Sequence, residues 1–498
     1  MARARKIALA AIVLTTSCSV PSPKGTVQID LSKESGNLPV STLGVRILPE
    51  EVPGNLSAEL VRGQDFEEGT DGWAIESCED AQAEWELTRD YPMMPTSPTS
   101  LMVTLPEKGK AVIRNTGFGG MAFKKGGYYY FRLNTAKGNR FDGELEILLK
   151  DGRGRILCDR PLYPDRDSTW CEYTGQLTSE GDCDDGLLEI EMKGKGTLYF
   201  DYVSLMPFAS FNKRIYGMRE DAGEALAELS PGFVRWDGGD RWKLTEGDPK
   251  GRVLFGIQEF FELSEDIGAD AHLGFRGKPL PNDVTGAAEY ARGDGTTFWS
   301  RQRILQQREE YPLALMEADE PYAIDVPYGV PFVKNSTIVI PTGEPSVEAA
   351  LLCRIESKDT LAVPESLLGR GDGSKAILSV GVNEMRKTVS YNVWKLFNAN
   401  RPDVSLPATL SGCADNVSVS AGIDTLAREA VVKIVNQNEK RVALDLVFEN
   451  GKAAFSAGTG MILHFDSGRI DERTIDGDKD SFPMNIPPTS MIIFRTSI

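Results

Sequence analysis

Residues 218–239 read MREDAGEALAELSPGFVRWDGG, and this stretch decides the fold of the chain. The apolar residues from Arg219 to Leu229 are spaced for one buried helix face, and Pro231-Gly232 ends that helix. The apolar run Phe233–Trp236 follows directly and predicts a short buried strand. Alternation of strands with helices is typical of a parallel sheet, because neighbouring parallel strands need a crossover connection.

The same alternation continues along the chain. We expect further helices at residues 255–267, 285–291 and 300–307, and strands at residues 271–275 and 313–316. Two more helices are predicted at residues 347–355 and 387–398. Strands and helices in this order close naturally into a (β/α) barrel, so residues 208–403 are predicted to form one.

On both sides of this region the pattern changes to short strands of alternating polarity. Turn signals such as Lys108-Gly109 and Gly194-Lys195-Gly196 separate them, so residues 67–207 and 404–498 each predict a β-sandwich. Residues 25–66 are assigned to the first barrel strand, after which the first sandwich is inserted. That sandwich holds aromatic residues of the kind that stacks on sugar rings, with core packing as the alternative for each: Trp73, Trp85, Tyr128, Tyr129, Tyr130 and Trp170.

Residues 1–24 predict an export signal and a tether. A positively charged start at residues 3–6 precedes an apolar run at residues 7–14 and the small residues Thr15-Thr16-Ser17-Cys18. This break resembles a bacterial lipobox, in which Cys18 is acylated, although a plain signal peptide with an incidental cysteine is the alternative. We therefore expect an exported protein of the cell envelope, lipid-anchored at the outer membrane or cell surface.

The charge balance restricts the partners. The formal net charge is −18, and no stripe rich in lysine or arginine offsets it. Such a surface repels nucleic acid and anionic membranes, whereas a neutral or cationic ligand such as a plant polysaccharide fits it. The alternative is that the acidic surface only keeps the protein soluble.

The side chains that remain for chemistry are mainly carboxylates. Only two histidines occur, His272 and His464, so a Ser-His-Asp triad or a histidine metal site is hard to assemble. No cysteines form a CxxC pair, and neither a metal nor a cofactor is expected. Cys158 and Cys171 are candidates for a disulfide outside the cytoplasm, with free thiols as the alternative.

Six stretches, in order between residues 42 and 407, match one enzyme family. They are residues 44–51 (GVRILPEE), 57–67 (SAELVRGQDFE), 218–239, 262–269 (ELSEDIGA), 348–359 and 391–407 (YNVWKLFNANRPDVSLP). The sequence thereby resembles the family 51 glycoside hydrolases, the α-L-arabinofuranosidases. The resemblance implies hydrolysis of terminal α-L-arabinofuranosides in plant polysaccharides by a retaining mechanism.

That mechanism needs one carboxyl group as acid/base and a second as nucleophile, about 5–5.5 Å away. The resemblance places the acid/base at Glu320, where Ala318 and Asp319 replace the family's usual Gly and Asn. A surface-loop glutamate is the alternative for Glu320. The family's nucleophile falls near residues 331–336, which contain no carboxylate. Glu344 is a weak candidate, since an acid there also suits the start of the next helix.

The resemblance implies further substrate contacts at Glu50, Glu51, Arg235, Asp237 and Asp319. An internal salt bridge beneath the barrel mouth is the alternative role for Arg235.

Only 27 residues lie between Glu320 and Glu348, which is room for about one βα unit. The family's fifth and sixth strands fall in this interval, so we expect an incomplete barrel that has lost part of its active-site wall. Two hypotheses follow: an α-L-arabinofuranosidase with impaired activity, or a non-catalytic glycan-binding surface lipoprotein. A purely structural surface lipoprotein is a third hypothesis, which no feature of the sequence specifically supports.

Overall fold

The structure is a computed structural model. It describes residues 25–34, 36–37, 42–78, 82–95, 97–138, 140–164, 169–214, 217–239, 255–305, 307–320, 326–334, 336–356, 358, 360–371, 374–413, 415–451, 457–478 and 481–498. The expected signal segment and Cys18 lie outside these residues. Within them, helices are too short or too polar to span a bilayer.

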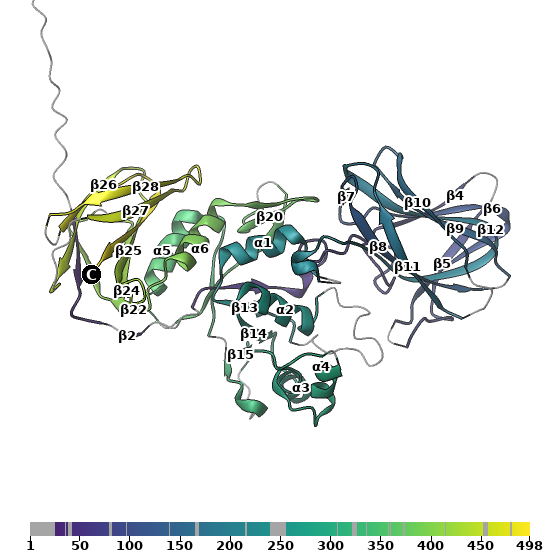
Figure 1. Cartoon of the computed structure of the whole chain (residues 1–498), viewed down its shortest axis with the longest axis horizontal. Coiled ribbons are helices and arrows are strands. Elements are labelled where there is room, and N and C mark those ends of the chain that lie inside the picture. The colour runs from purple at the N-terminus through teal and green to yellow at the C-terminus, as the bar shows by residue number, and fades with distance from the viewer. Residues whose placement is uncertain are drawn as a thin grey trace, which may run out of the picture.

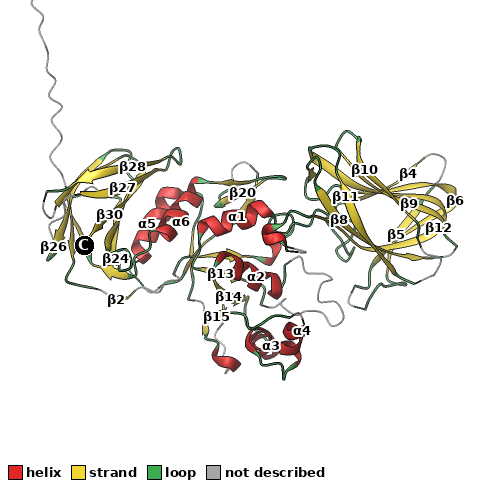
Figure 2. Ribbon diagram, in the orientation of Figure 1, coloured by secondary structure: helices red, strands yellow, loops and turns green. Residues whose placement is uncertain are grey.

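An α/β region lies between two β-sandwiches, so that the molecule is elongated (Figures 1 and 2). The predicted fold class, an incomplete (β/α) barrel with an inserted and a C-terminal sandwich, is confirmed.

The α/β region contains five parallel strands in the order β16-β15-β14-β13-β3. Their bounds are β3 (Gly44–Ile47), β13 (Phe233–Trp236), β14 (Asp270–Phe275), β15 (Leu313–Ala318) and β16 (Phe332–Lys334). A separate parallel pair, β17 (Ile338–Ile340) and β18 (Ala362–Pro364), is joined to the start of β3 by a bridge between Leu43 and Ala362. A complete barrel has eight strands. This one is incomplete, and β16 lies directly beside β15.

Alternate residues of this sheet face the helices. Val45, Trp236 and Met316 are buried in one core with the apolar faces of the helices. Two helices end in the left-handed conformation that closes a last turn, α1 at Ser230 and α2 at Gly268. The helices are α1 (Glu220–Leu229), α2 (Ile257–Ile267), α3 (Pro281–Arg292), α4 (Phe298–Leu305), α5 (Pro345–Glu356) and α6 (Val389–Ala399). A small sheet, β19 (Leu368–Arg370), β20 (Leu378–Val380) and β21 (Met385–Lys387), lies between α5 and α6 in sequence.

The inserted sandwich has its own core, and two long strands run through both of its sheets. The prediction that Lys108-Gly109 and Gly194–Gly196 separate strands is wrong, because β6 and β12 continue through them. At Gly194 and Gly196 the register shifts, and positive φ angles of 145° and 114° let the strand bend there. The strands are β4 (Trp73–Cys78), β5 (Glu84–Thr88), β6 (Ser100–Asn115), β7 (Met121–Phe123), β8 (Tyr128–Lys137), β9 (Asp142–Lys150), β10 (Ile156–Leu162), β11 (Cys171–Thr178) and β12 (Cys183–Pro207).

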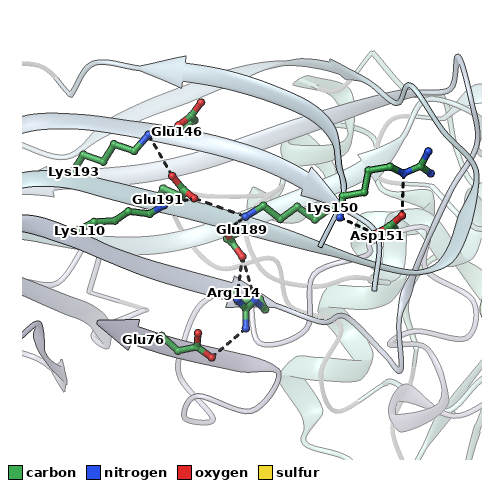
Figure 3. Close-up of polar contacts among 10 residues, drawn as sticks. Glu76, Lys110, Arg114, Glu146, Lys150, Asp151, Glu189, Glu191 and Lys193 are labelled. Carbon is green, nitrogen blue, oxygen red and sulfur yellow. Dashed lines mark hydrogen bonds and ion pairs between the residues drawn. The ribbon is translucent and has the colours of Figure 1, made fainter. Parts of the chain in front are cut away.

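Ion pairs cover the outer face of one sheet of this sandwich (Figure 3). Glu191 lies 2.6 Å from Lys110 and 3.3 Å from Lys193, and Arg114 bridges Glu76 and Glu189 at 3.1 Å each. Lys150 contacts Glu189 as well, and Glu146 pairs with Lys193. Alternation of inward apolar and outward charged residues is typical of a sheet with one solvated face. We call these eight residues the sandwich lattice.

The C-terminal sandwich packs a four-stranded sheet, β23-β1-β26-β29, on a seven-stranded one. The assignment of residues 25–66 to the barrel is therefore wrong for β1 (Gly25–Asp30) and β2 (Gly36–Asn37), which pair with β26 and β22. A short strand that buries Val27 and Ile29 does not specify which sheet it joins. The other strands are β22 (Val404–Leu406), β23 (Ala408–Ser411), β24 (Val417–Asp424), β25 (Glu429–Asn436), β26 (Val442–Glu449), β27 (Ala457–His464), β28 (Ile470–Asp476), β29 (Ser481–Ile486) and β30 (Ser490–Ser497).

Candidate functional site

The carboxyl ends of the parallel strands gather most of the predicted site residues at one edge of the sheet, which we call the rim. Glu50 and Glu51 lie in the 3₁₀ turn Pro49–Glu51 after β3. Asp237 follows β13, and Asp319 and Glu320 follow β15. Parallel strands end at the same edge, and barrel enzymes build their active sites there. The roles of these residues stay predictions.

Below the rim, the inner face of the sheet carries ion pairs. Asp237 accepts hydrogen bonds of 2.6 Å from the Nε atoms of both Arg46 and Arg235. Arg235 Nη1 also lies 3.0 Å from Glu317 Oε2. Arg235, Asp237 and Glu317 are at most 5% exposed, so two cations and two anions balance in a buried setting. Arg235 thus forms the internal salt bridge that was its alternative interpretation. We call Arg46, Arg235, Asp237 and Glu317 the barrel network.

Sequence reasoning missed Glu317. Besides Arg235, its carboxylate accepts hydrogen bonds from the Thr337 backbone N–H at 3.0 Å and the Thr337 hydroxyl at 2.7 Å. These contacts join β15 to the segment after β16. The predicted strand ends at Met316, whereas β15 continues to Ala318 and buries Glu317, and a buried carboxylate needs a partner.

The rim is tied together by Arg276, which follows β14 and was also missed. Its Nη2 atom lies 3.0 Å and 2.8 Å from the two carboxylate oxygens of Glu50. The next backbone N–H, of Gly277, donates to Asp319 Oδ2 at 3.1 Å. The ends of β3, β14 and β15 are thereby linked. Glu320 lies beside this link with an exposed side chain, where a ligand can reach its carboxyl group.

Besides its position at the rim, Glu51 has a pKa that suits acid chemistry. Burial raises the pKa of Glu51 to about 7, and the neighbouring charge of Glu50 acts in the same direction. A weak hydrogen bond of 3.4 Å from the Leu48 backbone N–H opposes this shift. At slightly acidic pH this carboxyl group therefore keeps a proton that it can donate.

Glu344 is not part of β16 but follows β17 in the chain. Glu344 precedes α5 and caps it: its carbonyl accepts hydrogen bonds from Val347 and Glu348, and its N–H donates to Glu348 Oε1 at 3.2 Å. Its side chain is exposed. β16 itself ends at Lys334, so the strand near which the resemblance places the nucleophile ends without a carboxylate.

The histidines and cysteines stay apart from the rim chemistry. His272 stacks on Phe233 with ring centroids 4.3 Å apart, and burial lowers its pKa to about 4. Cys158 and Cys171 are free thiols, so the candidate disulfide is not formed. Across the described residues, no three His, Cys, Asp or Glu side chains are grouped to hold a metal ion.

Comparison with known proteins supports the resemblance, although no family model matches the sequence. α-L-Arabinofuranosidase 1 of Arabidopsis thaliana is 25% identical over 345 residues, which cover 58% of this chain and 50% of that protein. The extracellular exo-α-L-arabinofuranosidase of Streptomyces chartreusis is 26% identical over 323 residues, covering 50% of this chain and 36% of that protein. The chain thus spans half or less of these relatives.

A solved structure of an arabinose-bound GH51 α-L-arabinofuranosidase shares the fold. It has a TM-score of 0.80 at 18% identity, and the match covers 95% of this chain and 100% of that one. Sequence similarity and fold therefore agree with each other and with the motifs found along residues 42–407. The chain is a divergent GH51-like protein with an incomplete barrel.

Proposed function

We propose that this chain acts on glycans that carry terminal α-L-arabinofuranosyl residues, as a hydrolase with impaired activity. The observation that carries the proposal is the rim, where Glu50, Glu51, Asp319 and Glu320 meet at the carboxyl ends of the strands. The curated relatives that match this chain are α-L-arabinofuranosidases.

In the proposed reaction Glu320 protonates the glycosidic oxygen as the bond to the anomeric carbon breaks. The second carboxylate attacks that carbon, and water then displaces it while Glu320 takes back a proton. Glu344 remains the candidate for the second group. We expect slow turnover, because β16 ends without a carboxylate and the barrel network holds Asp237 and Glu317 in salt bridges.

The alternative is a non-catalytic glycan-binding protein, and one observation favours it. β16 ends at Lys334, so the expected nucleophile strand offers a cation in place of a carboxylate. A rim without a nucleophile still presents carboxylates and an arginine that can hydrogen-bond sugar hydroxyls.

Release of nitrophenol from a chromogenic α-L-arabinofuranoside by residues 19–498 tests the two readings. We expect slow release that Glu320→Gln abolishes and Glu344→Gln lowers strongly. Glu310→Gln is the matched control, because Glu310 is exposed but lies before the opposite end of β15. No release above background from folded protein would reject the hydrolase and leave the binding function.

We also propose export and a lipid anchor at Cys18, supported by the lipobox-like sequence alone. Incorporation of a labelled fatty acid into the full chain, and its loss in Cys18→Ala, tests this. A chain released from the membrane fraction in both forms would contradict it.

A further inference from the structure

Three exposed aromatic rings lie on one face of the inserted sandwich, where it joins the barrel. Tyr128 is 50% exposed and Tyr130 is 55% exposed, whereas Tyr129 and Phe131, which alternate with them on β8, are buried. Phe208 is 64% exposed and follows β12. Its backbone N–H donates to the Tyr128 carbonyl at 2.8 Å, so Phe208 continues the antiparallel pairing of β12 with β8. The three rings therefore share the outer face of this sheet.

The fold does not need these rings. The core of the sandwich takes Tyr129 and Phe131 from the same strand, so the outward positions are free to be polar. On the other sheet of the same sandwich, the outward positions hold the sandwich lattice (Figure 3). Exposed aromatic surface is unfavourable in water, and clustered exposure marks a binding surface. The contrast between two outer faces of one sandwich points to a ligand.

A cavity of about 340 Å³ lies against these rings. Tyr130, Met206 and Phe208 supply its apolar wall, and Thr174, Ser204 and Ser210 contribute hydroxyl groups. Ligand sites typically combine an apolar wall with a few polar groups. A sugar ring matches this combination, because it has an apolar C–H face and a rim of hydroxyls.

Two of the three cations that line this cavity are already paired with carboxylates. Arg214 lines it but is held by Asp266 through hydrogen bonds of 2.7 Å and 2.6 Å. Arg132 also lines it, and its Nε atom lies 3.3 Å from Glu172 Oε2. Both guanidinium charges are therefore already compensated, so a carboxylate-bearing chain would gain little from the two arginines, and Lys213 is the third cation that lines the cavity.

A second cavity of about 320 Å³ lies on the other side of Phe208 and also touches Tyr128. Both cavities are lined by Pro207 and Phe208, so they follow one another along the seam between sandwich and barrel. The second cavity reaches Gly54, three residues after Glu51 of the rim. We call the two cavities together the seam groove.

We propose that the seam groove binds a neutral, arabinose-containing oligosaccharide by stacking its rings on Tyr130 and Phe208. The groove itself rests on geometry, and only the choice of sugar rests on the proposed function. A glycan held there would lie along the seam between sandwich and barrel, where the groove could retain a polymer.

Isothermal titration of residues 19–498 with a linear arabino-oligosaccharide tests this proposal. We expect Tyr130→Ala and Phe208→Ala each to weaken binding roughly tenfold or more, because a central aromatic anchor is lost. Tyr130→Phe keeps the ring and should bind nearly as the unaltered chain does. Tyr163→Ala is the matched control, since Tyr163 is 67% exposed on the same sandwich but lines neither cavity.

Unchanged binding in Tyr130→Ala and Phe208→Ala would overturn the proposal, as would absence of binding by the unaltered chain or stronger binding of polygalacturonate than of the neutral sugar. Glu320→Gln separates this test from that of the hydrolase, because it should remove turnover and leave groove binding intact. Binding that needs Tyr130 without any turnover would keep the groove and reject the hydrolase. Turnover by the unaltered chain, together with normal binding by Tyr130→Ala and Phe208→Ala, would keep the hydrolase and reject the groove.

Discussion

The inserted sandwich and the barrel both carry alternating cations and carboxylates. In the sandwich they lie on an outer face, and in the barrel they lie on the inner face of the sheet. The sandwich lattice lies on an outer face, where Glu76 is 53% and Lys193 is 38% exposed. In the barrel network, Arg235, Asp237 and Glu317 are at most 5% exposed. Water can therefore replace a lost partner at the exposed edge of the sandwich lattice, but not in the barrel network or at the central Glu189 and Glu191, which are 3% and 9% exposed.

This difference bears on function. Arg235 holds the buried carboxylates of Asp237 and Glu317 in place, so these two residues stabilise the incomplete barrel. Two of the predicted site residues at the rim differ from them, because Glu320 is exposed and burial raises the pKa of Glu51 to about 7. At β15, the exposed Glu320, the predicted acid/base, lies only three positions after the buried, salt-bridged Glu317.

The largest effect should come from breaking the barrel network. Arg235→Met leaves Glu317 buried without its cation, so we expect a loss of about 3–5 kcal/mol in the free energy of unfolding. Urea denaturation measures the loss, and hydrogen exchange should place it in β13 to β15. Adding Glu317→Gln should recover part of it, since the double variant buries one charge fewer. A loss below about 1 kcal/mol would show that water reaches this network.

Glu59 is a buried carboxyl group that accepts its hydrogen bonds from Ser204 and backbone N–H groups, so it can be compared with the salt-bridged carboxylates through the pH dependence of the free energy of unfolding. Burial raises the pKa of Glu59 to about 7, against the hydrogen bond of 2.5 Å from the Ser204 hydroxyl. The folded state then holds a proton that the unfolded state releases, so stability falls as pH rises from about 4.5 to about 7, by about 3 kcal/mol. Urea titrations across this range measure the slope. Glu59→Gln should flatten it, and an unchanged slope would assign it to other groups such as Glu51.

Glu191, at the centre of the sandwich lattice, should contribute a stability that changes with pH in the opposite direction. Although burial opposes ionisation, hydrogen bonds from Lys110 and Lys193 hold the pKa of Glu191 below its usual value. Its contribution is therefore present above the unfolded pKa near 4.5 and is lost as pH falls through the folded one. Glu191→Gln should cost about 1 kcal/mol at pH 7 and almost nothing in strong acid. An equal cost at both pH values would contradict this assignment.

The smallest effect belongs to the edge of the sandwich lattice. Glu76→Gln removes one exposed partner of Arg114, which keeps Glu189. We expect a loss of less than about 0.5 kcal/mol that disappears in molar salt, because exposed pairs are screened. Thermal unfolding at low and high salt measures it. A loss as large as that of Arg235→Met would remove the distinction between the two networks.

By itself, the sequence determined the classes of structure and the resemblance to one enzyme family. The helical spacing of residues 219–229, the apolar runs at 233–236 and 313–316, and the short spacing from Glu320 to Glu348 were enough for an incomplete barrel. These features are local, and local periodicity follows from the geometry of one helix or strand. The rim residues were named from the family resemblance instead, and the structure places them after β3 and β15.

The tertiary structure decided what depends on partners distant in sequence. β1 joins the C-terminal sandwich, β6 and β12 run through both sheets, and Glu317 meets Arg235 and Thr337. The exposure of Tyr128, Tyr130 and Phe208 beside a cavity also emerges only there. The physical reason is that strand pairing and burial are set by the whole chain's packing, and one strand sequence is compatible with several sheets.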